Sequence, residues 1–235
     1  MTAPATETTV AILLAAGASA RMGEADKLWA PLAGQPLVAH ALRMLGTLPG
    51  VDLLVVAAPA ARHAQLGELA RGLPCALRCV EGGTRRQDSV AAALAAAPDA
   101  AWYLVHDAAR PLATPALAAR VLAAARSQRL GEGAAVPAVP VVDTIKRVDD
   151  AGHVLDTLDR VTLRAAQTPQ AFAGPLLRRA HAELRTLDAT DDAALVAALG
   201  VLVVTVDGEP ANLKVTYPAD LVIAAALLAQ RTSAP

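Results

Sequence analysis

Short apolar runs of strand length recur along this 235-residue chain, and longer segments with helical spacing of apolar residues lie between them. The runs typical of buried strands are residues 8–16, 51–58, 76–83, 133–141 and 201–208, with a further run that starts at residue 101 and continues into a loop ending at residue 111. The segments typical of helices are residues 36–48, 60–71, 84–97 and 115–129. Thr84 followed by Gln87 has the form of a capping box for the third of these helices.

This alternation of strand and helix predicts an α/β fold. The strands are apolar on both faces, which is typical of a Rossmann-like, mostly parallel sheet covered by helices on both faces. Ligands of such sheets bind at the carboxyl ends of the strands. The length is sufficient for one core, so we expect a single domain over residues 1–235.

Residues 139–166 depart from this order. Apolar and polar residues alternate on both sides of the turn-forming sequence "DDAGH", which predicts a β-hairpin arm that projects from the body. Because an isolated hairpin is marginally stable in water, we expect the arm to pack against a second copy of the chain in a homodimer.

Composition and charge narrow the class of protein. Hydrophobic residues make up 54% of the chain and aromatic residues 2%, so we expect a core of closely packed Ala, Val and Leu. A net charge of −1 argues against nucleic acid as a partner. No apolar run reaches the roughly 18 residues of a membrane span, and the first residues lack a secretory signal, so we expect no membrane partner and a cytoplasmic location. Cys75 and Cys79 lack the companions of a zinc site, and we expect both to be buried.

The loop after the first strand has the chemistry of a phosphate site. In "LLAAGASARMGEADK", residues 13–27, small residues leave the backbone N–H groups accessible to an anion, and Arg21 and Lys27 follow them. The sequence fails the Walker, dinucleotide-binding and hydrolase-elbow patterns. On the residues alone, two cations on one polyphosphate and two solvated cations on an exposed loop both remain open.

A set of motifs, in order, extends this observation over most of the chain. They are "LLAAGASARMGEADK", "PLAGQPLVAH", "EGGTRRQDSV", "VHDAARPL", "VVDTIKRV", "LDRVTLRAAQTPQAF", "DATDD" and "ANLKVTYPADL". The set resembles the 2-C-methyl-D-erythritol 4-phosphate cytidylyltransferases of the non-mevalonate isoprenoid pathway, from about residue 9 to 230. The first two motifs also resemble other sugar and polyol phosphate nucleotidyltransferases.

The resemblance implies an enzyme and its reaction. A phosphate oxygen of 2-C-methyl-D-erythritol 4-phosphate would attack the α-phosphorus of CTP in line, giving 4-diphosphocytidyl-2-C-methyl-D-erythritol and pyrophosphate. The resemblance assigns Arg21, Lys27 and Lys214 to catalysis, as cations around the phosphates. Mg²⁺ would arrive with CTP, because no fixed cage of metal-binding residues is evident in the sequence.

The resemblance also assigns the residues that recognise each substrate. Those for the nucleotide are Ala15, Ala16, Gly17, Gly82, Gly83 and Ser89. Those for the polyol phosphate are Asp107, Arg110, Thr144, Arg160, Thr168 and Thr190, with Thr144 and Arg160 on the arm, so a neighbouring subunit would complete the phosphate clamp.

Structural alternatives stay open for several of these residues. Gly82 and Gly83 could form a plain turn, and Ser89 could bond within its own helix. Asp107 and Arg110 could form a local ion pair, and Thr190 could cap a helix that has Asp191 and Asp192 in its first turn.

Five further residues bear on the site. Ser19 stands where the family often has Gly, and Asp26 stands where Pro commonly precedes the lysine, so an acid beside Lys27 could weaken its hold on the triphosphate. Arg85 and Arg86 oppose the dipole of the helix that they begin, and we place both outside the site. We interpret His106 as structural, because an ionised phosphate needs no general base.

Two rival functions remain on the sequence. One is a cytidylyltransferase for ribitol 5-phosphate or another polyol phosphate, and the other is a non-catalytic CTP-binding protein. The presence of Arg21, Lys27 and Lys214 together argues against the second. Some family members continue into a second enzyme, and we expect none after the last helix here.

Overall fold

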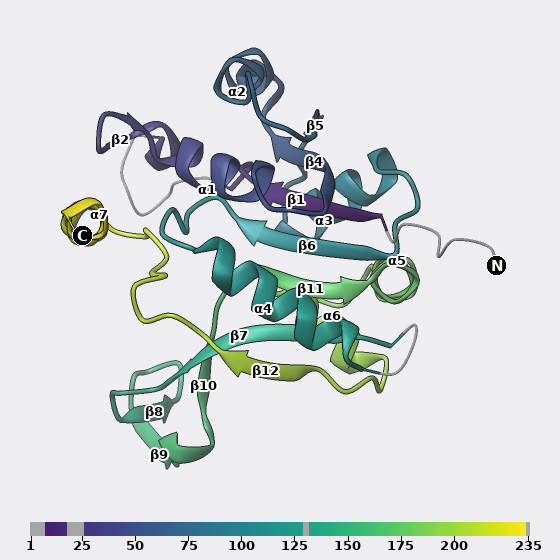
Figure 1. The fold of residues 1–235 in the computed structure, drawn as a ribbon. Helices are drawn as coiled ribbons and strands as arrows, with labels where there is room; N and C mark the ends of the chain where they lie inside the picture. The colour runs from purple at the N-terminus through teal and green to yellow at the C-terminus, as the bar shows by residue number, and fades with distance from the viewer. Residues whose placement is uncertain (1–7, 18–25, 129–131, 234–235) are drawn as a thin grey trace.

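A mixed eight-stranded sheet forms the centre of the molecule (Figure 1). The computed structural model describes residues 8–17, 26–128 and 132–233. The strand order is β10–β7–β11–β6–β1–β4–β5, and β12 pairs with β7 outside this path. The strands are β1 (Thr9–Leu14), β4 (Val51–Ala58), β5 (Ala76–Glu81), β6 (Trp102–Asp107), β7 (Ala134–Pro140), β10 (Arg164–Ala166), β11 (Gln170–Ala173) and β12 (Val204–Asp207).

The centre of the sheet is parallel, as predicted. Strands β6, β1, β4 and β5 run in one direction, and β12 runs parallel to β7. Strands β10 and β11 are antiparallel to their neighbours, and the sequence pattern did not predict either. The reason is length, since β10 has three residues and β11 has four, too few to show a period.

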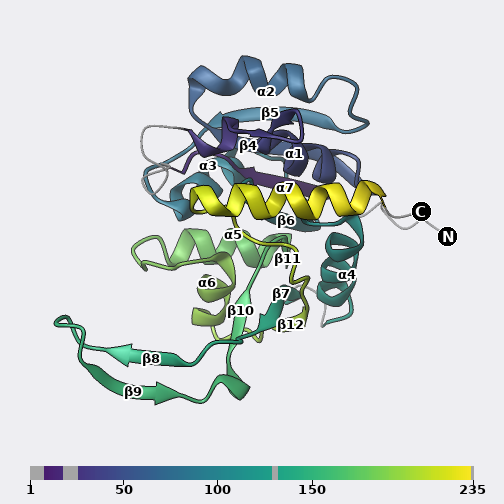
Figure 2. The same ribbon diagram turned by 90° about the vertical axis from the view of Figure 1, so that its left-hand side faces the viewer.

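Helices cover both faces of the sheet (Figure 2). Helices α1 (Leu37–Gly46) and α4 (Pro115–Arg126) lie on one face, and α3 (Arg86–Ala96), α5 (Gly174–Glu183) and α6 (Asp192–Ala198) lie on the other. Helix α2 (His63–Leu69) packs on the edge strand β5, and α7 (Pro218–Ser233) lies beside the carboxyl ends of β1 and β6. None of the described helices is long and apolar enough to span a bilayer.

Burial explains why the central strands are apolar throughout. Val10, Ala11, Ile12 and Leu13 of β1 are fully buried, because helices pack on both sides of them. The core consists mainly of Ala, Val and Leu, as the composition predicts, and Tyr103 and Phe172 are large rings within it. Removing this apolar surface from water is the main stabilising term of the fold.

The predicted arm is present. Strands β8 (Ile145–Val148) and β9 (Val154–Leu158) form a separate antiparallel hairpin that projects from the body (Figures 1 and 2). Asp149 shapes its turn, since its carboxylate accepts hydrogen bonds from the backbone N–H groups of Ala151 and His153. Gly152 in the same turn has φ +85°, a conformation that favours glycine.

Two local predictions were wrong. Asp88 caps helix α3, because its carboxylate accepts hydrogen bonds from the Arg85 backbone N–H (3.2 Å) and the Thr84 hydroxyl (3.3 Å). The helix begins later than the sequence pattern indicates, so Gln87 is not the partner of Thr84 and instead donates to the carbonyl of Leu184. Cys75 and Cys79 are half-buried thiols, because Cys79 lies on the edge strand β5 and Cys75 immediately precedes it.

Candidate active site

A cavity of about 220 Å³ opens at the carboxyl ends of β1 and β6, where ligands of such sheets bind. We call it the first cavity. The loop after β1 contributes Ala16 and Gly17 to its wall, and the segment between β5 and α3 contributes Gly83. Ser89 from α3 and Lys214 from the segment before α7 also line it. Small residues and a cation therefore line one space.

Lys27 lines the same cavity from the 3₁₀ helix η2 (Lys27–Trp29). The carboxylate of Asp26 accepts a hydrogen bond from the Leu28 backbone N–H (3.2 Å) and forms an ion pair with Arg62 (3.3 Å). The guanidinium of Arg62 also stacks on Trp29, at 4.6 Å from the ring centroid. The acid beside Lys27 is therefore engaged by its own helix and by another cation. Arg21 and Ser19, two other residues singled out in this loop, lie outside the described residues.

Gly82 and Gly83 make a close approach that a side chain would block. A Cβ added at Gly82 would lie 2.1 Å from Cβ of Ala16, and one at Gly83 would lie 2.3 Å from Cβ of Asp88. The Gly83 N–H donates to the Ser89 hydroxyl at 3.1 Å. The Ser89 hydroxyl also donates to the carbonyl of Arg85, four residues earlier, so the alternative interpretation of a local bond by Ser89 is confirmed. The segment between β5 and α3 therefore lies close against the loop after β1 at Gly82 and Ala16, beside the cavity.

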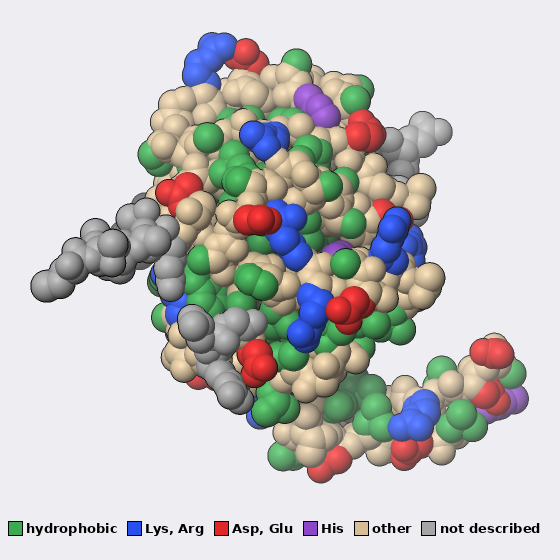
Figure 3. Space-filling view, turned by 90° about the vertical axis from the view of Figure 1, so that its right-hand side faces the viewer, with side chains coloured by type: hydrophobic (Ala, Val, Ile, Leu, Met, Phe, Trp, Pro, Cys, Tyr) green, Lys and Arg blue, Asp and Glu red, His purple; other side chains and the backbone are tan. Residues whose placement is uncertain are grey.

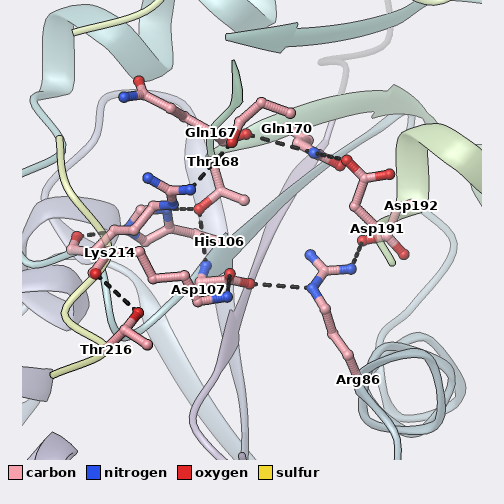
Figure 4. Close-up of polar contacts among 12 residues, drawn as sticks. Arg86, His106, Asp107, Gln167, Thr168, Gln170, Asp191, Asp192, Lys214 and Thr216 are labelled. Atoms are coloured by element: carbon pink, nitrogen blue, oxygen red, sulfur yellow. Dashed lines mark hydrogen bonds and ion pairs between the residues drawn. The ribbon is translucent and has the colours of Figure 1, made fainter. Parts of the chain in front are cut away.

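A second cavity, of about 210 Å³, adjoins the first. Thr168, Arg110 and Thr190 line it. Arg86, Asp107 and Lys214 line both cavities. These three side chains come from α3, the end of β6 and the segment before α7, and Figure 4 shows Asp107 between the two cations.

Asp107 accepts from both cations. Lys214 Nζ lies 2.7 Å from Oδ2, and Arg86 Nε lies 3.2 Å from Oδ1. Burial opposes ionisation, but Arg86 and Lys214 outweigh it and hold the pKa of Asp107 well below its usual range. Burial likewise opposes the charge of Arg86, yet Asp192 and Asp107 raise its pKa above the ordinary value. Asp107 and Arg86 are therefore both charged at neutral pH.

His106 and Thr168 support Asp107 from behind (Figure 4). The Thr168 hydroxyl oxygen accepts from the Asp107 backbone N–H at 3.1 Å and lies 2.8 Å from His106 Nδ1. His106 Nε2 lies 3.2 Å from the carbonyl of Arg110, so Nε2 carries the proton and Nδ1 accepts from Thr168. Burial lowers the pKa of His106 to about 4. A neutral imidazole with both nitrogens engaged has the structural role that the sequence indicated.

Arg110 is held by backbone carbonyls. Its guanidinium donates to the carbonyls of Asn212 (2.7 Å) and Ala166 (3.2 Å), and burial lowers its pKa. The alternative of a local Asp107–Arg110 ion pair is wrong, because the carboxylate of Asp107 turns toward Arg86 and Lys214 instead. Arg110 remains positively charged and lines the second cavity.

Thr190 lines the second cavity and does not cap α6. Asp191 is the cap, since its carboxylate accepts from the Ala194 backbone N–H at 2.9 Å. The alternative that Thr190 caps the helix is therefore wrong, because the cap is the next residue in the chain. The hydroxyl of Thr190 is free of capping and can face a ligand.

Two residues predicted to bind the polyol phosphate do not reach either cavity of their own chain. Thr144 and Arg160 are exposed on the arm, and Arg160 at the start of the 3₁₀ helix η4 (Arg160–Thr162) donates to the carbonyl of Val142. Neither lines the first or second cavity.

The sequence placed Arg85 and Arg86 outside the site, but both line the first cavity. Arg86 also lines the second cavity, and its guanidinium contacts Asp107. The position of Arg86 at the start of a helix could have indicated this role, because a cation that opposes the helix dipole needs an anionic partner. That partner lies in other segments of the chain, which sequence spacing does not reveal.

The described residues around the cavities do not form a metal cage. Among residues 8–17, 26–128 and 132–233, no group of three His, Cys, Asp or Glu side chains is arranged to hold an ion. The one carboxylate that the described residues contribute to the first cavity is Asp107, and both its oxygens bind cations. A divalent ion would therefore need ligands from a bound phosphate.

Comparison with known proteins gives one consistent result. Residues 9–230 match the family described as 2-C-methyl-D-erythritol 4-phosphate cytidylyltransferase. A protein of that description from Nocardia farcinica is 47% identical over 227 residues, which cover 95% of each chain. A crystal structure so described, from Thermus thermophilus, is 37% identical, covers 93% of this chain and 98% of its own, and has a TM-score of 0.74. A 4-diphosphocytidyl-2C-methyl-D-erythritol synthase from Anaerococcus prevotii is 26% identical, with coverage of 96% and 100% and a TM-score of 0.83.

Proposed function

This chain belongs to the family of 2-C-methyl-D-erythritol 4-phosphate cytidylyltransferases, and we propose that its two adjoining cavities hold the two substrates of that reaction. The chain is a nucleotidyltransferase of isoprenoid biosynthesis that joins CTP and 2-C-methyl-D-erythritol 4-phosphate. The products are 4-diphosphocytidyl-2-C-methyl-D-erythritol and pyrophosphate. In this proposal CTP occupies the first cavity and the polyol phosphate occupies the second.

The main support for this arrangement is that the two cavities share lining residues. Arg86, Asp107 and Lys214 line both cavities, so the α-phosphate of CTP and the phosphate of the acceptor would meet beside them. Two phosphates repel each other, and cations at their meeting point lower that repulsion. The ammonium of Lys214 is held at this point by Asp107.

The transfer is an in-line displacement at phosphorus. An oxygen of the acceptor phosphate forms a bond to the α-phosphorus while the bond from that phosphorus to the α,β-bridging oxygen breaks, and pyrophosphate leaves with the electron pair. Lys27 and Lys214 offset the negative charge on the transferred and leaving phosphates, together with Arg21. An acceptor phosphate is ionised near neutral pH and needs no base. Neutral, fully bonded His106 is consistent with this.

The nucleotide is recognised mainly by backbone groups. The segment of Ala15, Ala16 and Gly17 and the segment of Gly82 and Gly83 approach each other beside the first cavity, and Ser89 holds Gly83. Backbone donors and acceptors at such an edge can pair with the ring of cytosine, and small residues leave room for it.

Mg²⁺ would bind through the CTP phosphates. The donor set fits an ion that arrives with the nucleotide, with Asp107 as the one carboxylate that the described part of the chain contributes to the first cavity. The ion would supply further neutralisation of phosphate charge. Lys27 and Lys214 contribute their charges in the same space.

A second copy of the chain would complete the acceptor site. Asp107, Arg110, Thr168 and Thr190 surround the second cavity, whereas Thr144 and Arg160 lie on the projecting arm. Figure 3 shows the arm clear of the body, with hydrophobic side chains among its charged ones. The exposed apolar residues of the arm include Val142, Val148, Val154, Leu155 and Val161. Burial of this surface in a homodimer would bring the arm to a neighbouring subunit. We also propose a cytoplasmic location for the enzyme.

Turnover by the purified protein tests this proposal. We expect pyrophosphate release with CTP and 2-C-methyl-D-erythritol 4-phosphate, and formation of the cytidine diphospho-polyol by mass spectrometry. Pyrophosphate release with ribitol 5-phosphate and CTP tests which polyol phosphate is the acceptor. Release with ATP, GTP or UTP in place of CTP tests the choice of nucleotide base. Faster turnover of ribitol 5-phosphate would overturn the acceptor assignment, and CTP binding without turnover would overturn catalysis.

A further inference from the structure

A line of alternating charges runs from the junction of the two cavities into the interior (Figure 4). Lys214 binds Asp107, Asp107 binds Arg86, and Arg86 Nη1 binds Asp192 Oδ2 at 2.7 Å. The other oxygen of Asp192 accepts from His181 Nε2 at 2.8 Å. Asp192 begins α6 and lines neither cavity.

The two ends of this line differ in exposure. The side chain of Lys214 is 44% exposed and that of Asp192 is 1% exposed, while Asp107 and Arg86 between them are 12% and 22% exposed. A carboxylate so deeply buried is retained only with strong partners, because its desolvation is costly. Burial opposes ionisation of Asp192, but Arg86 and His181 outweigh it and lower its pKa. The interior end of the line is therefore a fixed negative charge.

The geometry of Arg86 connects that charge to the reaction. A guanidinium is planar and presents its N–H groups in a rigid fork, so binding at one edge sets the direction of the other. Asp192 takes Nη1, which leaves Nε directed at Oδ1 of Asp107. The other oxygen of Asp107 holds the ammonium of Lys214.

We propose that Asp192 is a positioning residue for the transfer step, acting through Arg86 to fix Asp107 and the Lys214 ammonium where the two phosphates meet. This inference rests on the proposed function. Asp192 touches neither substrate. Without its charge, Arg86 has one carboxylate instead of two and moves toward Asp107 or toward a bound phosphate, and either movement displaces Lys214.

The primary test is Asp192→Asn, which keeps the shape of the side chain and removes its charge. We expect kcat to fall about 10- to 100-fold, because misplaced charge at the reacting phosphates costs transition-state stabilisation. We expect the KM for CTP to change less than about threefold, because Lys27 and the glycine segments remain. Asp192→Glu retains the charge, and we expect it to recover most of kcat per folded enzyme.

A double variant tests whether Asp192 acts through Arg86. Arg86→Gln alone removes the connection, so adding Asp192→Asn to it should lower kcat by less than about twofold. The double variant also protects the test against misfolding. If Asp192→Asn alone does not fold, the double variant should still fold, because it removes both buried charges together. Independent, multiplicative losses in the double variant would overturn the proposal.

Tyr103→Phe is the matched control for lost stability. Tyr103 is fully buried on β6, and its hydroxyl bonds to Arg178 (2.6 Å) and to the carbonyl of Pro98 (2.9 Å), away from both cavities. We expect a lower Tm with unchanged kcat. Equal kcat in wild type and Asp192→Asn, or equal losses in Asp192→Asn and Asp192→Glu, would overturn the positioning role. Absence of turnover in the wild type would instead overturn the proposed function.

Discussion

The ammonium of Lys214 lies 2.7 Å from the carboxylate of Asp107, although 107 positions separate the two residues in the chain. Backbone contacts bring their segments together. The Val215 N–H donates to the carbonyl of Ala109 at 2.8 Å, and Arg110 donates to the carbonyl of Asn212 at 2.7 Å. The segment before α7 is thereby tied to the loop after β6, and both cavities acquire a cation that neither would have from β6 alone.

Lys27→Ala tests the cation at the first cavity. We expect kcat/KM to fall about 100-fold or more, because the ammonium faces the space assigned to the triphosphate and no longer offsets its charge. Pyrophosphate release measures this. Arg71→Ala is the control, since Arg71 is exposed and pairs with Glu68 away from both cavities. Unchanged turnover in Lys27→Ala would defeat the assigned role.

Gly82→Ala tests the close approach of the two nucleotide segments. The new Cβ would lie 2.1 Å from Cβ of Ala16, so the segments must separate, and we expect the KM for CTP to rise on the order of 10- to 100-fold. Titration calorimetry with CTP gives an independent measure. Gly67→Ala in α2 meets nothing within 4 Å and should bind CTP normally, with a stability gain of up to about 1 kcal/mol. Wild-type CTP affinity in Gly82→Ala would contradict the prediction.

Leu155→Glu tests the arm. Leu155 is 63% exposed on β9, and a charge there should oppose burial against a second subunit. We expect a monomer by sedimentation equilibrium, with a KM for the polyol phosphate raised roughly tenfold through loss of contacts from the arm. The KM for CTP should not change. Val222→Glu on α7, where Val222 is 72% exposed, is the matched control and should remain dimeric. A dimer in Leu155→Glu would argue against this interface.

The stability of the protein should fall with acid because of His106. Burial lowers the pKa of His106 to about 4, below the ordinary value of about 6.5 in the unfolded chain. Between these values the unfolded chain binds a proton that the folded chain does not, so stability is lost as pH falls from about 6.5 to about 4. We expect the free energy of unfolding in urea to drop by about 2 kcal/mol between pH 7 and pH 5 from this group. The lowered pKa values of Asp107 and Asp192 extend the loss to lower pH.

A His106→Asn variant isolates that effect. We expect it to be less stable at pH 7, because the hydrogen bonds to Thr168 and to the Arg110 carbonyl change. Its unfolding free energy should vary less between pH 7 and pH 5 than that of the wild type. The same dependence in both proteins would show that His106 is not the titrating group.

Local sequence was sufficient for most of the elements. Continuous apolar runs identified β1, β4 and β6 because both faces of these strands are covered. The family resemblance, and not the local pattern, singled out Gly82 and Gly83, and the structure shows that both make close approaches. The three- and four-residue strands β10 and β11 gave no period and were missed. The cap of α3 was misplaced because the first turn of a helix is set by which side chains reach its N–H groups, here Asp88.

The charged network required the fold. Arg86 binds Asp107 and Asp192, which lie 21 and 106 positions away, and no periodicity relates residues at such separations. Arg86 at the start of α3 meets Asp107 at the end of β6, although α3 follows β5, which lies three strands away from β6 in the sheet. Helices α3 and α6 lie on the same face of the sheet, where Asp192 meets Arg86. Side-chain type and local spacing therefore determined which chemistry was available, whereas chain topology determined which charges meet, because Coulomb interactions depend on distance in space and not on distance along the chain.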